Sequence, residues 1–141
     1  MNYDIKMVAV DIDGTFVHSD YTYDILRFQR ILSRMNDAGC HFVVASGNQY
    51  YQLRDLFPGY YNELSFVAEN GAFVKDGQEL IFTANIPKDT VDAVIDVCRD
   101  YPEISNVLCG VESAYCQRGT VSQEFFDLTA IYYHRLKWVD D

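Results

Sequence analysis

Two aspartates, Asp11 and Asp13, combine the residue type and the spacing that could support catalysis in this 141-residue chain. They directly follow an apolar run, Met7 to Val10, and precede Gly14, which allows the chain to turn out of a sheet. Carboxylates at positions i and i+2 of such a loop can face one cavity. One can then attack an electrophile and bind Mg²⁺ while the other exchanges protons. A plain polar turn is the alternative for an isolated Asp-x-Asp-Gly sequence.

Polar residues also follow two further short apolar runs, which we predict to be buried strands of the same sheet. Ser46, Gly47 and Asn48 follow residues 42–45, and a Glu-Asn-Gly sequence follows residues 66–68. In an open α/β sheet the carboxyl ends of parallel strands form one edge, where ligands bind. The Ser46 hydroxyl and nearby backbone amides could hold phosphate oxygens at this edge. Ser-Gly-Asn alone is an ordinary turn, but three polar strand ends together predict a ligand site.

The periodicity of apolar residues predicts an α/β fold with a parallel sheet, because short apolar runs alternate with amphipathic stretches. In the first part we predict buried strands at 7–10, 42–45 and 66–68, helices at 24–37 and 50–57, and a hairpin turning at Asp76-Gly77. A second segment starts near Pro87. It should contain a helix capped by Asp89 or Thr90, strands at 106–109 and 114–116, a helix at about 122–132 and a strand from His134.

Composition excludes several classes of function. The chain has 11 Lys and Arg against 21 Asp and Glu, a net charge of −10, which disfavours binding to nucleic acid. No apolar run is long enough to span a membrane, and the first residues do not have the pattern of a signal peptide. The four cysteines form no Cys-x-x-Cys pair, so we expect reduced thiols in a cytoplasmic protein.

These motifs resemble those of the haloacid dehalogenase (HAD) superfamily, and within it the Cof-type subfamily IIB, whose members carry a large inserted α/β cap. The matching stretches cover nearly the whole chain: VAVDIDGTFV, FVVASGNQYYQL, FVAENGA, the CGVESAYC region and YYHRLKWV. ASGNQYYQL followed by FVAENGA is similar to bacterial sugar phosphatases in particular. The resemblance implies a Rossmann-like core over residues 1–84 and a partial cap over residues 85–141. A loop of that cap carries Glu112, Ser113 and Tyr115, which could contact the substrate.

The resemblance also implies a role for each residue of the motifs. Asp11 would be the nucleophile that forms an aspartyl-phosphate, and Asp13 the acid and base that protonates the leaving sugar oxygen and then activates water. Both residues would bind Mg²⁺, Asp13 through its backbone carbonyl. Ser46 would hold a phosphoryl oxygen, supported by Gly47 and Asn48. The expected partner is therefore a sugar phosphate or a similar small phosphorylated metabolite.

The family further implies a later lysine and an acidic Gly-Asp-x-x-Asn-Asp-like motif, and neither is found in these 141 residues. We therefore expect the N-terminal half of the family's core with an incomplete cap, impaired in activity. The first strand would then lie at an edge of the sheet, where it could pair with a second copy or with a complementing chain. A non-catalytic assembly module that pairs through this edge is one alternative function. A phosphomutase-type phosphotransferase is another.

Overall fold

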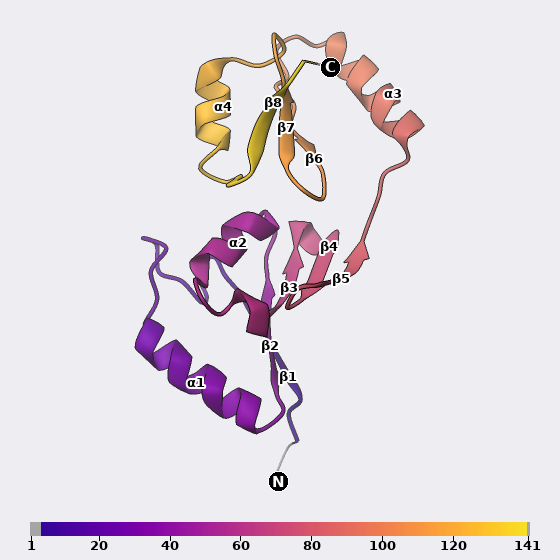
Figure 1. Ribbon diagram of the computed structural model, residues 1–141. Coiled ribbons are helices and arrows are strands. Elements are labelled where there is room, and N and C mark those ends of the chain that lie inside the picture. The colour runs from indigo at the N-terminus through magenta and orange to yellow at the C-terminus, as the bar shows by residue number, and fades with distance from the viewer. Residues whose placement is uncertain (1–3, 141) are drawn as a thin grey trace. The chain divides into compact units, whose positions relative to one another are not determined.

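The computed structural model describes residues 4–140 of a chain that divides into two compact units, Met1–Phe82 and Thr83–Asp141. The first unit is built around a five-stranded sheet and the second around a three-stranded sheet (Figure 1). The predicted α/β fold with a parallel-containing sheet is confirmed. The assignment of residues 1–84 to a core and of residues 85–141 to a partial cap stays a prediction. Within residues 4–140, no helix is long and apolar enough to cross a membrane.

The sheet of the first unit has the order β1-β2-β3-β4-β5, with two helices in the connections between its first three strands. The strands are β1 (Met7–Asp11), β2 (His41–Ala45), β3 (Ser65–Ala68), β4 (Phe73–Asp76) and β5 (Glu79–Thr83), and the helices are α1 (Ile25–Asp37) and α2 (Tyr50–Leu56). β1, β2 and β3 pair in parallel, and β4 pairs antiparallel to β3. β4 and β5 are neighbours on either side of the predicted turn, where Gly77 has a φ of +53°.

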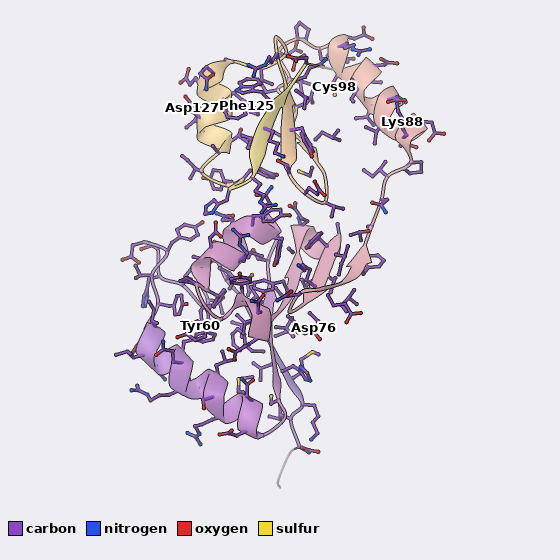
Figure 2. The ribbon with its side chains drawn as sticks, in the orientation of Figure 1. Tyr60, Asp76, Lys88, Cys98, Phe125 and Asp127 are labelled. Carbon is purple, nitrogen blue, oxygen red and sulfur yellow. The ribbon has the colours of Figure 1, made fainter. Side chains whose placement is uncertain are left out.

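Helix α1 begins and ends where the sequence predicts. The Asp24 side chain accepts a hydrogen bond of 2.8 Å from the Arg27 amide, and this cap contributes about 1 kcal/mol to helix stability. Phe28 and Leu32 are the buried residues of the helix, one turn apart on the same face. The Phe28 ring meets the ring of Tyr60 edge-on, with centroids 6.2 Å apart. Tyr60, labelled in Figure 2, therefore holds α1 against the segment that follows α2.

The core of the first unit is formed by apolar side chains from the strands, from both helices and from the loop after β1. Phe66 of β3 is fully buried and packs edge-on against Tyr50 of α2, with ring centroids 5.3 Å apart. Other core residues with no exposed surface are Ile12, Val44, Leu53, Phe57, Leu64 and Ala68. Burial of one such aliphatic or aromatic side chain stabilises the fold by about 1.5–3 kcal/mol.

Strand β1 lies at the edge of the sheet, as expected for the N-terminal half of the family's core, but it is not buried as its apolar run alone predicts. Met7 is 60% exposed and Val8 is 37% exposed. The strand lies at an edge of the sheet and pairs with β2 alone, so its outer side has no partner strand among residues 4–140. An apolar run predicts a strand covered on both sides, but it does not identify the segment that covers it.

The second unit contains α3 (Lys88–Arg99), β6 (Leu108–Cys109), β7 (Ala114–Gln117), α4 (Gln123–Thr129) and β8 (Leu136–Val139). β7 pairs antiparallel to β6 and parallel to β8. Phe126 of α4 stacks on Trp138 of β8 with ring centroids 4.4 Å apart. The predicted cap of α3 at Asp89 or Thr90 is wrong, because Pro87 takes the capping position without a side-chain hydrogen bond. Its fixed φ already suits a helix start.

Truncation of a core side chain should separate buried from exposed strand positions. We expect Phe66→Ala to lower the free energy of unfolding by about 3–5 kcal/mol, because it leaves a cavity among rigid neighbours. Ile81→Ala in β5 is the matched control, since Ile81 is 54% exposed, and it should cost about 0.5 kcal/mol or less. Urea unfolding of both variants measures the difference. Equal costs would contradict the burial described here.

Candidate active site

The strand register brings three polar loops to one edge of the first unit's sheet. Asp11 at the end of β1 is the partner of Ala45 at the end of β2, and Ala45 is the partner of Val67 in β3. The Ser46 amide donates to the Val67 carbonyl at 3.0 Å, which extends the pairing by one residue beyond β2. The predicted convergence of the polar strand ends is therefore present.

The loop after β1 presents two exposed carboxylates on either side of a buried anchor. Ile12 has no exposed surface, whereas Asp11 and Asp13 are both exposed. The Ile12 carbonyl accepts hydrogen bonds from the amides of Phe16 and Val17, both at 3.1 Å, so the loop closes tightly on this residue. The buried side chain and the closed turn together fix the position of both aspartates relative to β1.

The loop after β2 contacts Asp13 directly. The Asn48 side-chain amide donates to Oδ2 of Asp13 at 2.9 Å, and the Ser46 hydroxyl lies 3.5 Å from the same oxygen. The Asn48 backbone amide in turn donates to the Ser46 hydroxyl oxygen at 3.1 Å. The structure thus joins three of the five predicted site residues by contacts between side chains. Asp11 makes its described contact with Thr15, whose hydroxyl lies 3.5 Å from the Asp11 carboxylate.

The turn after β3, which is the third of the predicted polar strand ends, supports this loop. The Glu69 amide donates to the Asn48 carbonyl at 3.1 Å, and the Asn70 amide donates to the Ser46 carbonyl at 3.4 Å. Glu69 and Asn70 have φ values of +52° and +55°, in the left-handed region. Asn tolerates this region but Glu does not favour it, and such strain persists only where surrounding contacts over-determine it. The Asn-Gly pair in the sequence indicated a turn at this position. No sequence feature indicated that Glu69 would adopt a left-handed backbone conformation.

Glu69 is also electrostatically distinct from the two aspartates. Its side chain is half-buried, and this burial raises the pKa of its carboxyl group because the charged form loses hydration. The pKa shift and the strained backbone occur in one residue beside the Asn48 loop. The turn thus supports the Asn48 loop through its backbone and carries a partly desolvated carboxyl group.

Gly47 lies where the two loops approach most closely. A Cβ atom at this position would come within 2.8 Å of the Asn70 side-chain oxygen, which is closer than real Cβ contacts allow. The residue is exposed, so the restriction comes from Asn70 and not from the core. Glycine at position 47 thus permits the packing of the two loops.

The donor set at this edge fits Mg²⁺ in part. Asp11 provides a hard carboxylate oxygen and Asp13 a backbone carbonyl oxygen, and Mg²⁺ is commonly held by one or two carboxylates together with substrate phosphate and water. Within residues 4–140 no group of three or more acidic, histidine or cysteine side chains is placed to hold a metal ion. The described residues therefore offer two protein ligands for the ion and not a complete protein cage.

Ser113, a predicted substrate contact, has a structural role instead. Its side chain is fully buried, and its hydroxyl lies 3.0 Å from the Ala114 carbonyl oxygen and 3.1 Å from that of Arg135. The hydroxyl thus links β7 to the segment entering β8. Its burial among backbone groups contradicts a direct contact with substrate.

Comparison with known proteins supports the motif order. A family profile described as haloacid dehalogenase-like hydrolase matches residues 8–138. The chain belongs to this family. The resemblance to HAD proteins of the Cof type is thereby confirmed, and the sheet with Asp11 at the end of its first strand is part of the fold that these proteins share.

Individual HAD relatives extend well beyond the length of this chain. The 5-amino-6-(5-phospho-D-ribitylamino)uracil phosphatase YbjI of Escherichia coli is 41% identical over 97% of this chain and 50% of its own length. The crystal structure of SMU.1108c from Streptococcus mutans matches with a TM-score of 0.85 and 33% identity, over 97% of this chain and 52% of that one. A structure from Eubacterium rectale matches with a TM-score of 0.83 and 26% identity. The chain therefore spans about half the length of these relatives.

The contact between Gly47 and Asn70 predicts a coupled pair of substitutions. Gly47→Ala should lower the free energy of unfolding by about 1–3 kcal/mol, because the added methyl group meets the Asn70 side chain. Asn70→Gly removes that side chain and suits a positive φ, so the double variant should lose much less than the sum of the two single variants. Urea unfolding of the four proteins gives the coupling energy. Additive losses would contradict the close approach of the loops.

Proposed function

We propose that this protein is a phosphomonoesterase that forms an aspartyl-phosphate on Asp11. The observation that carries the proposal is the contact of Asp13 with Asn48, 2.9 Å long, beside Asp11 at the carboxyl edge of the sheet in a HAD-family chain. This edge combines the exposed carboxyl group of Asp11, the carboxyl group of Asp13, and hydroxyl and amide donors. Those are the groups that phosphoryl transfer to a protein carboxylate requires.

The first chemical step uses both aspartates. A carboxylate oxygen of Asp11 attacks the phosphorus of the substrate, a P–O bond to Asp11 forms, and the bond to the leaving sugar oxygen breaks. Asp13, two residues away on the other side of the buried Ile12, transfers its proton to that oxygen. The rigid loop keeps the nucleophile and the acid in a fixed relation, which lowers the entropic cost of the step.

The second step returns both groups to their starting states. The Asp13 carboxylate takes a proton from water as the water oxygen bonds to phosphorus, and the bond between phosphorus and Asp11 breaks. Inorganic phosphate leaves, Asp11 is again a carboxylate and Asp13 again carries a proton. Water is the only co-reactant consumed, and both aspartates are regenerated.

The remaining predicted residues bind the phosphoryl group. Ser46 donates its hydroxyl to a phosphoryl oxygen, the exposed Gly47 offers a backbone amide, and Asn48 supports the loop through its bonds to Ser46 and Asp13. Asp11 and the Asp13 carbonyl would hold Mg²⁺, which neutralises negative charge on the phosphoryl group when it is bound. Since no ion pair joins Asp11 or Asp13 to a basic side chain in the described part of the chain, such neutralisation matters for attack by an anionic nucleophile.

The proposed substrates are sugar phosphates or similar small phosphorylated metabolites. The name of the YbjI relative describes a phosphate ester on a ribityl chain, and its 41% identity to this chain supports a substrate of that chemical class.

Substitution of the nucleophile tests the proposal. Asp11→Asn should reduce hydrolysis of p-nitrophenyl phosphate in Mg²⁺ by at least about a hundredfold, because the amide cannot form the aspartyl-phosphate. Asp37→Asn removes one carboxylate at the end of α1 and should leave the rate unchanged. Removal of Mg²⁺ with a chelator should abolish turnover, and added Mg²⁺ should restore it. Brisk turnover that Asp11→Asn does not change would overturn the assignment.

A second candidate function, assembly through the β1 edge, is favoured by the exposure of that strand. Met7 is 60% exposed, and the neighbouring Ile5 is 59% exposed on the same segment. An apolar edge with unpaired backbone groups is a template for pairing with another strand. We propose that this edge pairs with a second copy of the chain, or with a complementing chain when such a chain is present.

Light scattering coupled to size-exclusion chromatography tests the edge. We expect the unsubstituted protein to show a mass above its monomer value of 16.2 kDa at high concentration. Met7→Lys should shift it toward the monomer, because an edge lysine opposes strand pairing. Ile81→Lys in β5, at the opposite edge of the sheet, is the matched control and should have no such effect. A concentration-independent monomer would contradict assembly through β1.

A further inference from the structure

The contact between Asn48 and Asp13 places the two carboxyl oxygens of Asp13 in different environments. Oδ2 of Asp13 accepts from the Asn48 side-chain amide at 2.9 Å, and the Ser46 hydroxyl lies 3.5 Å from the same atom. A carboxylate only accepts hydrogen bonds, so Asn48 must present its NH₂ group and not its carbonyl oxygen. Both described donors thus approach Oδ2, and Oδ1 is left for other partners.

We propose that Asn48 is a positioning residue for Asp13: it holds Oδ2 so that Oδ1 is the oxygen that exchanges protons with the substrate and water. The inference deepens the proposed function and rests on it. In the first step the proton on Oδ1 moves to the leaving oxygen as the bond between that oxygen and phosphorus breaks. In the second step Oδ1 takes a proton from the attacking water.

Asn48 is suited to this role because its own backbone is held on both sides. Its amide donates to the Ser46 hydroxyl oxygen at 3.1 Å, and its carbonyl accepts from the Glu69 amide at 3.1 Å. The second bond comes from the strained turn after β3, so the support does not depend on the β1 loop. A side chain anchored in this way loses little further conformational entropy when it binds a carboxylate.

A role of Asn48 in binding phosphate alone makes a different kinetic prediction. A phosphate ligand contributes equally whichever alcohol is attached to the phosphate, and its loss mainly raises KM. A residue that positions the general acid contributes most where the leaving oxygen needs a proton. An alkoxide is a poor leaving group, whereas p-nitrophenolate departs without one. The two roles are therefore separated by the leaving group.

The kinetic test compares two esters in the 141-residue protein and in Asn48→Ala. For an alkyl phosphate such as glycerol phosphate, we expect kcat/KM to fall about tenfold to a hundredfold, mainly through kcat. For p-nitrophenyl phosphate we expect a much smaller fall. Asp13→Ala should show the same selectivity for the leaving group in stronger form, and the double variant should be no worse than Asp13→Ala. Equal losses for both esters with a raised KM would overturn the proposal.

A second test does not depend on turnover. The side-chain amide protons of Asn48 can be followed by ¹H–¹⁵N NMR and assigned from their loss in Asn48→Ala. Asp13→Ala should shift one of them upfield and speed its exchange with water, because the carboxylate acceptor is gone. Asp11→Ala is the matched control and should leave the signal in place, since Asp11 makes its contact with Thr15.

The two tests distinguish failure of the inference from failure of the proposed function. If the unsubstituted protein hydrolyses neither ester, the proposed function is contradicted, and the NMR result alone decides whether Asn48 holds Asp13. If Asp13→Ala leaves the Asn48 signals unchanged, the contact is absent in solution and the inference is overturned. Turnover that depends on Asp11 would still support the proposed function in that case.

Discussion

Burial of Ile12 is the constraint on which the geometry of the site depends. In an extended chain successive side chains alternate in direction, so a fully buried residue between two aspartates forces both aspartates out of the core. The same residue closes the turn through its carbonyl, which accepts two backbone amides at 3.1 Å. Hydrophobic burial and one hydrogen-bonded turn thus place two carboxyl groups two residues apart at one edge of the sheet.

The loop after β2 provides hydrogen-bond donors to Asp13, and the turn after β3 holds that loop in place. Each carboxyl group is approached by a hydrogen-bond donor, because Asn48 and Ser46 approach Asp13 while Thr15 approaches Asp11. These donors lie on a loop that is clamped by the left-handed turn at Glu69 and Asn70. Parallel register brings the three loops together, and the polar contacts among them follow from that register.

Much of this arrangement was predictable from residue patterns. Short apolar runs followed by polar residues indicated the parallel strands and the edge at which their loops converge, and the extent of α1 and the Asp76-Gly77 turn were also predicted. The apolar run of β1 alone predicted a buried strand, whereas the resemblance to the family predicted the exposed edge that is found. The bond from Asn48 to Asp13 was not predicted, because it depends on a loop conformation set by Asn70 and Glu69. The predicted cap of α3 was wrong because Pro87, and not Asp89 or Thr90, occupies the capping position.

The parallel pairing of β1 with β2 also has a consequence for folding kinetics. Asp13 and Asn48 are separated by 35 positions in the sequence, and they meet only after the α1 crossover has brought β1 and β2 side by side. Contacts of this kind carry a loop-closure cost that must be met before they contribute any stability, which slows their formation relative to helices and hairpins. The hairpin of β4 and β5 can form early from local contacts. Assembly of the carboxylate pair with its amide donor is therefore tied to a late event of chain folding.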